Sequence, residues 1–376
     1  MEIWIYGSYA EGFEREAIID GFIALRVARK YGEVSTLDMQ LAIDASGLIL
    51  TPSRWLYIPT LDSVFFIESA EITDGDGGMQ ASIRARGAEC LFDRRVIVDN
   101  KQYTNKYTSD IIAGELANIY KTAARQFPGY VSAIAPEMGL LYTKYTTAPG
   151  TFLDFMQEMC KVAGLGFRTE FNPADSTMTL SLYQGTDFSA RASAPVFSPE
   201  LETIYDMDFE DSIEQMCNVC YVIGELGTNN IPKKTTRTWR SGAYSGYERF
   251  EAVINFSASS NSDTSGTQVA TPDASGTSAA LTATQYADTM QGFGDRTLAE
   301  RQRSISMSGT VNANARTYVL GVDFDLGDIV RIRSARAELS SWQRLTAIDD
   351  QWTSRGYSRA LTLGSPLLGI GRLLRK

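Results

Sequence analysis

Three aspartates stand close together near the carboxyl end of the chain, in the run Gly321-Val322-Asp323-Phe324-Asp325-Leu326-Gly327-Asp328-Ile329-Val330. Carboxylates gathered in one place can bind a hard cation or act as a general acid and base. In an extended strand Asp323 and Asp325 would share a face, which favours such a site. A ligand motif needs its surrounding ligands, and the sequence offers none here, so we favour a structural role for all three aspartates.

A second acidic run, Asp74-Gly75-Asp76-Gly77-Gly78, resembles the beginning of a calcium-binding loop. A loop of the EF-hand type needs a glutamate at its twelfth position, but arginines occupy this stretch, at Arg84 and Arg86. Glycine and aspartate are also the preferred residues of tight turns. We therefore predict a turn.

The pair Cys217-Asn218-Val219-Cys220 has the spacing of a redox or metal motif. The surrounding residues are typical of a strand, in which positions three apart point to opposite faces, and there is no second pair of ligands. We predict reduced, buried thiols at Cys217 and Cys220. The other two cysteines, Cys90 and Cys160, stand alone.

Histidine is absent from all 376 residues. This removes the commonest general base and metal ligand, and with it the Ser-His-Asp and Cys-His classes of enzyme. Glycoside hydrolysis needs only two carboxylates, but no feature selects a pair among the 45 acids. We predict no catalytic residue, no metal site and no cofactor.

The net charge of −10 should repel nucleic-acid phosphates, so contact with DNA would be passage and not stable binding. The amino terminus lacks the basic start and apolar run of a signal peptide, and no window is apolar enough to span a bilayer. We expect a protein that is made in the cytoplasm and has no stable association with membranes.

The elements that would position these residues are mostly strands, as 18 Tyr and 17 Phe suggest. Residues 1–98 are predicted to form a first small β-barrel domain, in which a hairpin joins Val64–Thr73 to a strand within Met79–Gly87. Further strands are predicted at Glu2–Tyr6, Ala17–Lys30 and Val34–Ile43.

Residues 99–195 change to helical periodicity and are predicted to form an α+β lobe. One helix begins at Thr108-Ser109-Asp110, and a second begins near Thr151 and stops at Gly164. Two strands follow, at Leu165–Phe171 and Met178–Tyr183.

Residues 196–303 return to strand patterning. The segment Ser257–Thr284 holds almost no large apolar residue, so we predict a flexible loop there. A helix is predicted from Gln285 to about Arg303, with Gly292 and Gly294 as breaks.

Residues 304–366 are predicted to form a closing β-barrel domain with strands at Ile305–Thr310, Thr317–Val322, Asp328–Arg333, Trp342–Asp349 and Arg359–Leu363. The last ten residues, 367–376, combine an apolar set with basic residues. A free tail with five apolar side chains would be an unusual exposed patch, so we predict an assembly arm that docks on a neighbouring subunit or a tip protein. Its apolar residues are Leu367, Leu368, Ile370, Leu373 and Leu374.

Several segments together resemble the baseplate hub proteins of long-tailed phages, which are also called tail-associated proteins. The resemblance is one of order and spacing along most of the chain. It rests on Tyr31-Gly32-Glu33-Val34-Ser35, Leu91-Phe92-Asp93-Arg94-Arg95, Gly150-Thr151-Phe152-Leu153-Asp154-Phe155, Ala163-Gly164-Leu165-Gly166-Phe167, Asn218-Val219-Cys220-Tyr221-Val222 and Leu326-Gly327-Asp328-Ile329-Val330.

The resemblance implies a hub-type fold, with two barrel-like tube domains and a peripheral lobe of helices and a hairpin. It implies that the segment around Asp328 turns into a strand. It also implies a homotrimer, whose six barrels match a sixfold tail tube. Such a trimer would close the tube, carry the tip and let the genome pass. The expected partners are a distal tail or tube ring protein and a tip, spike or fibre protein, with a tape-measure protein as a further candidate, and the expected location is the virion tail.

Two other functions remain open at this stage. The first is a carbohydrate-binding or carbohydrate-cleaving β-protein of the virion, in which aromatic residues stack on sugars. Aromatics at alternating strand positions, such as Phe65 and Tyr318, are more often core residues. The second is another ring component, such as the distal tail protein or the tube protein, although the lobe at 108–183 is more than a bare tube subunit needs.

Overall fold

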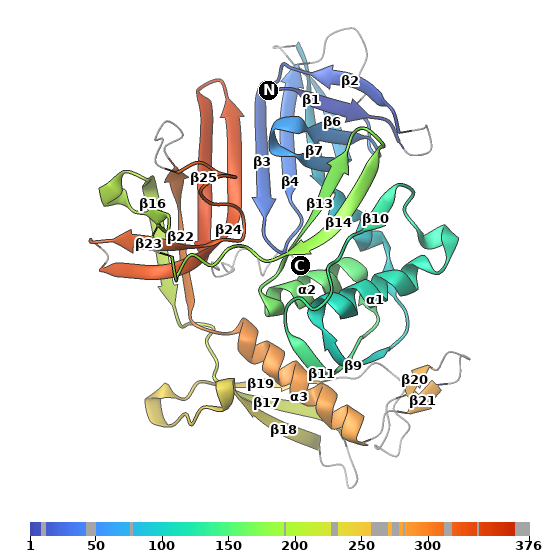
Figure 1. Cartoon of the computed structure of the whole chain (residues 1–376), viewed down its shortest axis with the longest axis vertical. Coiled ribbons are helices and arrows are strands. Elements are labelled where there is room, and N and C mark those ends of the chain that lie inside the picture. Colours follow the sequence, from blue (N-terminus) through green and yellow to red (C-terminus); the bar gives the residue numbers. More distant parts are fainter. Residues whose placement is uncertain are drawn as a thin grey trace.

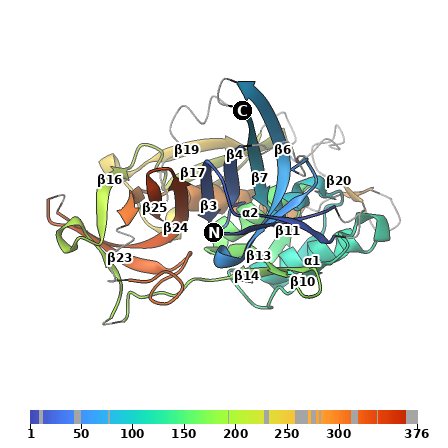
Figure 2. The same ribbon diagram turned by 90° about the horizontal axis from the view of Figure 1, so that it is seen from above.

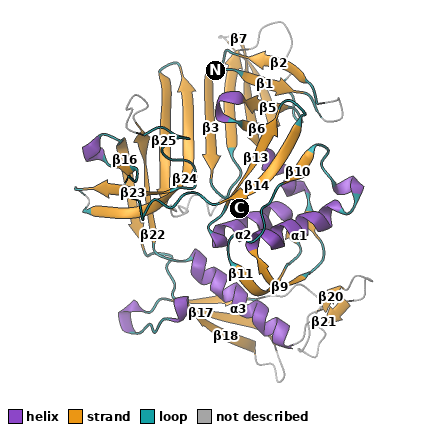
Figure 3. Ribbon diagram, viewed as in Figure 1, coloured by secondary structure: helices purple, strands orange, loops and turns teal. Residues whose placement is uncertain are grey.

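The computed structural model describes residues 1–8, 13–42, 50–75, 78–191, 193–226, 232–256, 270–272, 278–280, 283–311, 318–336 and 338–364. Within these ranges the chain is mainly β with an α+β lobe, as predicted (Figure 3). The first β-block occupies one end of the molecule, the last β-block lies beside it, and a helix-covered sheet lies at the opposite end (Figure 1).

The first block has seven strands in the order β2-β1-β5-β6-β7-β4-β3, and each strand pairs with its neighbours in this order. The predicted hairpin is confirmed, because β6 and β7 pair in antiparallel register from Phe65↔Gly87 to Gly75↔Gly78. The predicted single strand Ala17–Lys30 is wrong, since it is divided between β2 and β3. The strands are β1 (Ile3–Tyr6), β2 (Arg15–Ile19), β3 (Ala24–Lys30), β4 (Thr36–Ala42), β5 (Trp55–Ile58), β6 (Ser63–Gly75) and β7 (Gly78–Gly87).

The last block pairs β16 with β22, β22 with β25, and β25 with β24, and a short branch, β15 and β23, joins β24. The predicted strand Thr317–Val322 is wrong. Among its described residues, Val319 accepts backbone hydrogen bonds from Val322 and Asp323, and Gly321 has φ +81°, so the segment is a turn. The strands are β15 (Val196–Phe197), β16 (Ile204–Ser212), β22 (Ser304–Val311), β23 (Ile329–Ser334), β24 (Leu339–Thr353) and β25 (Gly356–Gly364).

The two β-blocks share one open sheet. Strand β3 pairs with β24 from Ala347↔Lys30 to Trp352↔Leu25, and this pairing completes a 13-stranded sheet. No sheet of the described strands closes into a ring. Each block keeps its own core, with Leu25, Ile67 and Ile83 in the first and Phe197, Ile348 and Leu363 in the last. Phe65 is fully buried and Tyr318 packs against the second core, so both have the predicted core role.

The α+β lobe packs on the first block. Its helices are α1 (Thr108–Tyr120) and α2 (Phe152–Ala163), and its longest strands, β13 (Gly166–Asn172) and β14 (Thr177–Tyr183), form the predicted hairpin. Both predicted helix starts are confirmed. The Thr151 hydroxyl accepts a hydrogen bond from the Asp154 N–H at the start of α2, and Gly164, with φ +66°, ends it.

Smaller strands complete the lobe: β8 (Val96–Ile97) pairs with β12 (Gly150–Thr151), β9 (Gln102–Tyr107) with β11 (Leu141–Thr146), and β10 (Tyr130–Ser132) with β14. A 3-10 helix, Ala88–Arg94, links the first block to the lobe. The lobe and the first block share one large cluster of buried side chains, in which Phe171 contacts the rings of Tyr6 and Tyr57.

A separate module is inserted between β16 and β22, which pair directly with each other. It contains β17 (Val219–Leu226), β18 (Pro232–Thr238) and β19 (Glu251–Asn255), and helix α3 (Ala283–Glu300) covers one face of this sheet (Figure 1). The predicted helix break at Gly292 and Gly294 is wrong, because α3 runs through both. A Cβ atom at Gly294 would lie 2.8 Å from Val222, so this glycine lets the helix pack closely on the sheet.

The predicted flexible loop at 257–284 lies mostly outside the described residues. Within it, β20 (Ala270–Pro272) and β21 (Ser278–Ala280) form a short antiparallel pair, and α3 begins at Ala283. The domain boundaries predicted from the sequence stay predictions. No helix in the described part of the chain has the length and apolar character needed to span a membrane.

Candidate functional site

One face of the 13-stranded sheet is polar across eight adjacent strands, β6, β7, β4, β3, β24, β25, β22 and β16. Side chains alternate between the two faces of a strand, so the register tells which residues lie on it. Ala28 lies opposite Asp349 and Thr36, and Thr362 lies opposite Ala347 and Ser308. The strands at the middle of this series run side by side in Figure 1. We call this surface the polar face.

Small and uncharged polar residues dominate the polar face. They include Ser69, Ser82, Gln40, Ala24, Ala28, Ala347, Gln351, Ala360, Thr362, Ser306 and Ser308. Large apolar side chains are concentrated on the opposite face, where Val27, Ile348 and Leu361 are completely buried. The β6–β7 hairpin extends beyond the rest of the sheet (Figure 2).

Charges on the polar face are nearly balanced, and three of its four bases form ion pairs. Arg26 forms a bidentate ion pair with Asp349, with Nε 2.8 Å from Oδ2. Lys30 lies 3.3 Å from Glu33, and Arg86 lies 3.4 Å from Glu68. The acids at register positions of the face are Asp38, Glu71, Asp208, Glu210 and Asp349, and the bases are Arg26, Lys30, Arg84 and Arg86.

A buried ion network holds the two β-blocks together behind this face. Asp350 of β24 is completely buried. Its carboxylate is 2.9 Å from the Arg29 guanidinium of β3 and 2.6 Å from that of Arg359 of β25, and it accepts a hydrogen bond of 2.6 Å from the Tyr357 hydroxyl. Because both oxygens of the carboxylate are satisfied, the charge is tolerated in the interior.

A second joint surrounds Tyr31, in the connection between β3 and β4. Its hydroxyl donates to the carbonyl of Gly164 at 2.9 Å, and Arg344 lies over its ring and donates to the carbonyl of Gly327 at 2.6 Å. A Cβ atom at Gly166 would lie 2.4 Å from the Tyr31 ring, and one at Gly327 would lie 2.3 Å from it. These glycines therefore allow the first block, the lobe and the last block to meet at one tyrosine.

Three of the segments on which the family resemblance rests meet at this joint. The segments beginning at Tyr31, Ala163 and Leu326 are far apart in the sequence, yet they converge around the same ring. Asp328 ties the end of the lobe to the last block, because its carboxylate accepts hydrogen bonds from the N–H groups of Thr186 and Asp325.

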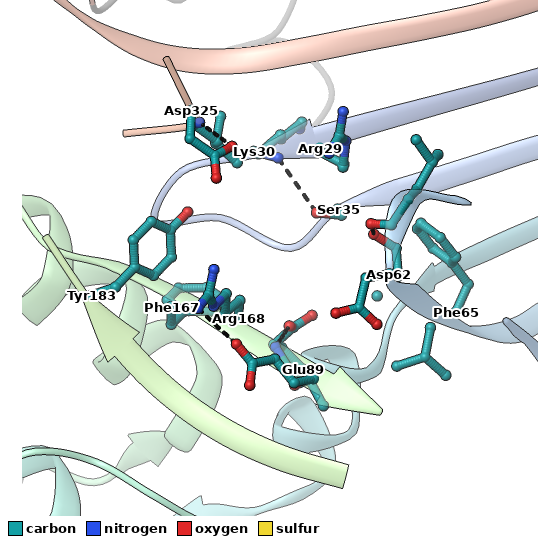
Figure 4. A pocket seen from close by; sticks show the side chains of 17 residues that line it. Arg29, Lys30, Ser35, Asp62, Phe65, Glu89, Phe167, Arg168, Tyr183 and Asp325 are labelled. Atoms are coloured by element: carbon teal, nitrogen blue, oxygen red, sulfur yellow. Dashed lines mark hydrogen bonds and ion pairs between the residues drawn. The ribbon is translucent and has the colours of Figure 1, made fainter. Parts of the chain in front are cut away.

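A polar cleft of about 280 Å³ opens beside this joint (Figure 4). Arg29, Lys30 and Asp62 of the first block line it, together with Arg168 and Tyr183 of the lobe. The charged groups already have protein partners: Arg168 pairs with Glu170 at 2.6 Å, and Asp62 accepts a hydrogen bond from Tyr57. The charged side chains of the cleft therefore join parts of the chain to one another.

Glu89 lies in the wall of this cleft and is buried. Its carboxylate accepts a hydrogen bond of 2.5 Å from the N–H of Thr169, which ties the 3-10 helix to β13. Loss of hydration raises the pKa of Glu89 above its ordinary value. No pattern in the sequence distinguishes Glu89 from the other acids, of which the chain has 45 in total.

The three aspartates singled out in the sequence have structural roles, as predicted. The idea that Asp323 and Asp325 share a strand face is wrong, since both lie in turns. Asp323 accepts a hydrogen bond from the N–H of Val319, and Asp325 accepts one from the N–H of Leu326. After Asp328 the chain enters β23, as the family resemblance implies.

All four cysteines are free and buried, which confirms the prediction for Cys217 and Cys220. Burial raises the pKa of both thiols, so they stay protonated near neutral pH. Among the residues that the structure describes, no three His, Cys, Asp or Glu side chains are grouped so that they could hold a metal ion. The predicted assembly arm, 367–376, lies outside the described residues.

Comparison with solved structures identifies the fold. A 43 kDa tail protein of prophage MuSo2 from Shewanella oneidensis is 10% identical, with 96% of this chain and 98% of that chain covered and a TM-score of 0.58. The prophage tail protein gp18 from Listeria monocytogenes EGD-e is 11% identical, with coverages of 100% and 97% and a TM-score of 0.56. A tail protein from Neisseria meningitidis MC58 is 14% identical, with both coverages 96% and a TM-score of 0.54.

No curated protein matches the sequence. A model of the Siphovirus ReqiPepy6 Gp37-like protein family, by contrast, matches residues 2–365, which is almost the whole chain. The family resemblance predicted from the sequence is confirmed. The chain therefore belongs to the Siphovirus ReqiPepy6 Gp37-like family and has the fold of prophage tail proteins.

Proposed function

We propose that this protein is a structural component of a phage tail, located at the baseplate or tail tip, where three copies close the end of the tail tube. The observation that carries the proposal is the polar face, a continuous wall to which both β-blocks contribute through the pairing of β3 with β24. In a ring of three chains this face would line the channel.

The chemistry of the polar face suits the passage of DNA. Small polar side chains offer little apolar surface to which bases could stick, and the arginines near Asp349 and Glu68 are neutralised by these acids. Stable DNA binding depends on cationic side chains that replace counterions on the phosphates. A wall without unpaired basic clusters, on a protein of net charge −10, would let the genome slide.

The proposed trimer also follows from two β-blocks in each chain, because three chains then present six blocks to a sixfold tube. Native mass spectrometry of the purified protein and of extracted tail tips tests the number of copies. A trimer is expected in the tip. A monomer in dilute solution would agree with the proposal, since such rings can need their neighbours to form, but a hexamer or a monomer in the extracted tip would refute it.

We place this ring between a distal tail or tube ring protein above and a tip, spike or fibre protein below. In this position the protein would be an adaptor and would have no catalytic activity of its own. Incubation of purified protein with bacterial cell walls and with exopolysaccharide tests this. The expected result is no release of soluble muropeptides or sugars, and release that a single Asp or Glu substitution abolishes would overturn it.

A further inference from the structure

Strand β16 is a free edge of the 13-stranded sheet, and it is unusually acidic. Among the described strands it pairs with β22 alone, so the hydrogen-bonding groups along its other side have no strand partner. Its sequence, Ile204-Tyr205-Asp206-Met207-Asp208-Phe209-Glu210-Asp211-Ser212, has four acids in nine residues. Asp211 pairs with Arg303, whereas Asp206, Asp208 and Glu210 are exposed on the surface.

Apolar side chains accompany these acids. Tyr205 is 46% exposed, Ile213 just beyond the strand is 51% exposed, and Met207 and Phe209 are half-buried. Charges and the backbone irregularity at Asp206, with φ +51°, protect an edge against pairing with foreign strands. Exposed apolar side chains give no such protection. Together with the acids, they indicate that a segment with both basic and apolar side chains binds this edge.

We propose that the carboxyl-terminal segment 367–376 of the same chain docks along the free edge of β16. This segment has three bases, Arg372, Arg375 and Lys376, beside its five apolar residues. It therefore complements the edge in both charge and hydrophobicity. This inference does not depend on the proposed trimer. It places the segment on its own subunit, whereas the arm predicted from the sequence docks on a neighbouring subunit or a tip protein.

The path of the chain supports docking within one subunit. Gly364, the last described residue, pairs with Ser306 of β22, and Ser306 pairs with Glu210 of β16. Strands are about 4.8 Å apart, so the free edge of β16 is about 14 Å from Gly364. Five residues, 365–369, can span about 17 Å when extended. The remaining seven, which include all three bases and Ile370, Leu373 and Leu374, can then follow β16 for about 23 Å.

Hydrogen–deuterium exchange of the full chain tests this proposal. Deletion of 367–376 should raise the exchange rates of amides in Asp208–Ser212 at least tenfold and leave those of β23 unchanged. The double substitution Asp208→Lys and Glu210→Lys should likewise release the segment, with at least tenfold faster exchange in 367–376. Adding Arg372→Glu and Arg375→Glu to that variant should restore protection, which also shows that the variant is folded.

The other free edge of the sheet provides a matched control. Glu14→Lys and Asp20→Lys, which flank strand β2, make the same change of charge and should leave exchange in 367–376 unchanged. Unchanged exchange after the β16 substitutions, or equal release by the β2 substitutions, would overturn the proposal.

Cross-linking distinguishes the chain's own edge from that of a neighbour. A bifunctional thiol reagent applied to a variant with Glu210→Cys and Leu373→Cys should yield an internally linked monomer. A product of dimer mass in place of the linked monomer would mean that the segment docks on another copy, and docking within the chain would be refuted.

Discussion

Among single residues, Tyr31 lies in a tightly constrained joint. Gly166 and Gly327 each lie so close to its ring that a methyl group would collide with it, and Gly185 approaches the backbone of Gly327 even more closely. Tyr31, Gly166 and Gly327 lie in three segments that resemble a known family in sequence. The sequence does not show why the glycines are needed, because a glycine that admits a distant side chain looks the same as a glycine in a loop.

Gly185→Ala should therefore destabilise the fold strongly. A Cβ atom there would lie 2.1 Å from the Gly327 backbone, which cannot move as freely as the end of a side chain. We expect a loss of about 2 kcal/mol or more in the free energy of unfolding, measured by urea denaturation.

The matched control is Gly292→Ala, because no atom lies within 4 Å of a Cβ at this helical position. It should stabilise the protein by about 0.5 to 1 kcal/mol. Equal effects of the two substitutions would show that the joint around Tyr31 is not tightly packed.

The raised pKa of Glu89 should make the stability of the fold depend on pH in a definite direction. Burial raises its pKa, so the native state holds the proton more tightly than the unfolded chain does. The contribution of Glu89 to stability is therefore fully present below the unfolded-state pKa, near 4.5, and is lost as the pH rises through the folded-state pKa.

Glu89→Gln removes this titration and keeps an oxygen that can accept the hydrogen bond from Thr169. Urea denaturation at about pH 4 and pH 7 should show the variant gaining stability relative to the wild-type protein at the higher pH. A difference that stays constant with pH would mean that Glu89 does not titrate between the folded and unfolded states in the way described.

At the scale of elements, local signals were sufficient for helix α2 and the β6–β7 hairpin. Thr151, Gly164 and the Asp-Gly turn each act on their immediate neighbours, so the sequence contains the whole explanation. The pairing of β3 with β24 joins residues more than 300 positions apart, and no local pattern predicts it. The same is true of Asp350, whose burial depends on that pairing.

Asp350→Ala tests the seam between the two β-blocks. Removing the carboxylate leaves Arg29 and Arg359 facing each other in a mostly buried place, and breaking such a network costs about 3 to 5 kcal/mol of unfolding free energy. The exposed pair of Asp211 with Arg303 is the control, and Asp211→Ala should cause a much smaller loss. Similar losses from both substitutions would show that the buried network does not hold the blocks together.

At the scale of the whole molecule, the proposed channel is built from the polar face. Its composition was not visible in the sequence, because its residues come from eight strands whose order only the structure gives. With five acids and four bases at its register positions, the polar face offers DNA no net positive charge.

New unpaired cations on the polar face should hinder genome passage. Gln40→Arg together with Gln351→Arg adds two guanidinium groups that can bind phosphates. Phage particles carrying both should assemble normally and eject DNA more slowly, and added salt should reduce the defect. Ala117→Arg, on the exposed side of helix α1, should leave the ejection rate unchanged. Unaltered ejection by the double variant would argue against a channel lined by this face.

The position of the polar face in an assembled tail tip shows whether this face lines the channel. A cryo-electron microscopy map of the tip should show three copies of this chain in a ring, with β7, β4, β3, β24 and β25 turned toward the channel and the α+β lobe outside. A ring in which this face points outward or is covered by another protein, or a tip with a different number of copies, would contradict it.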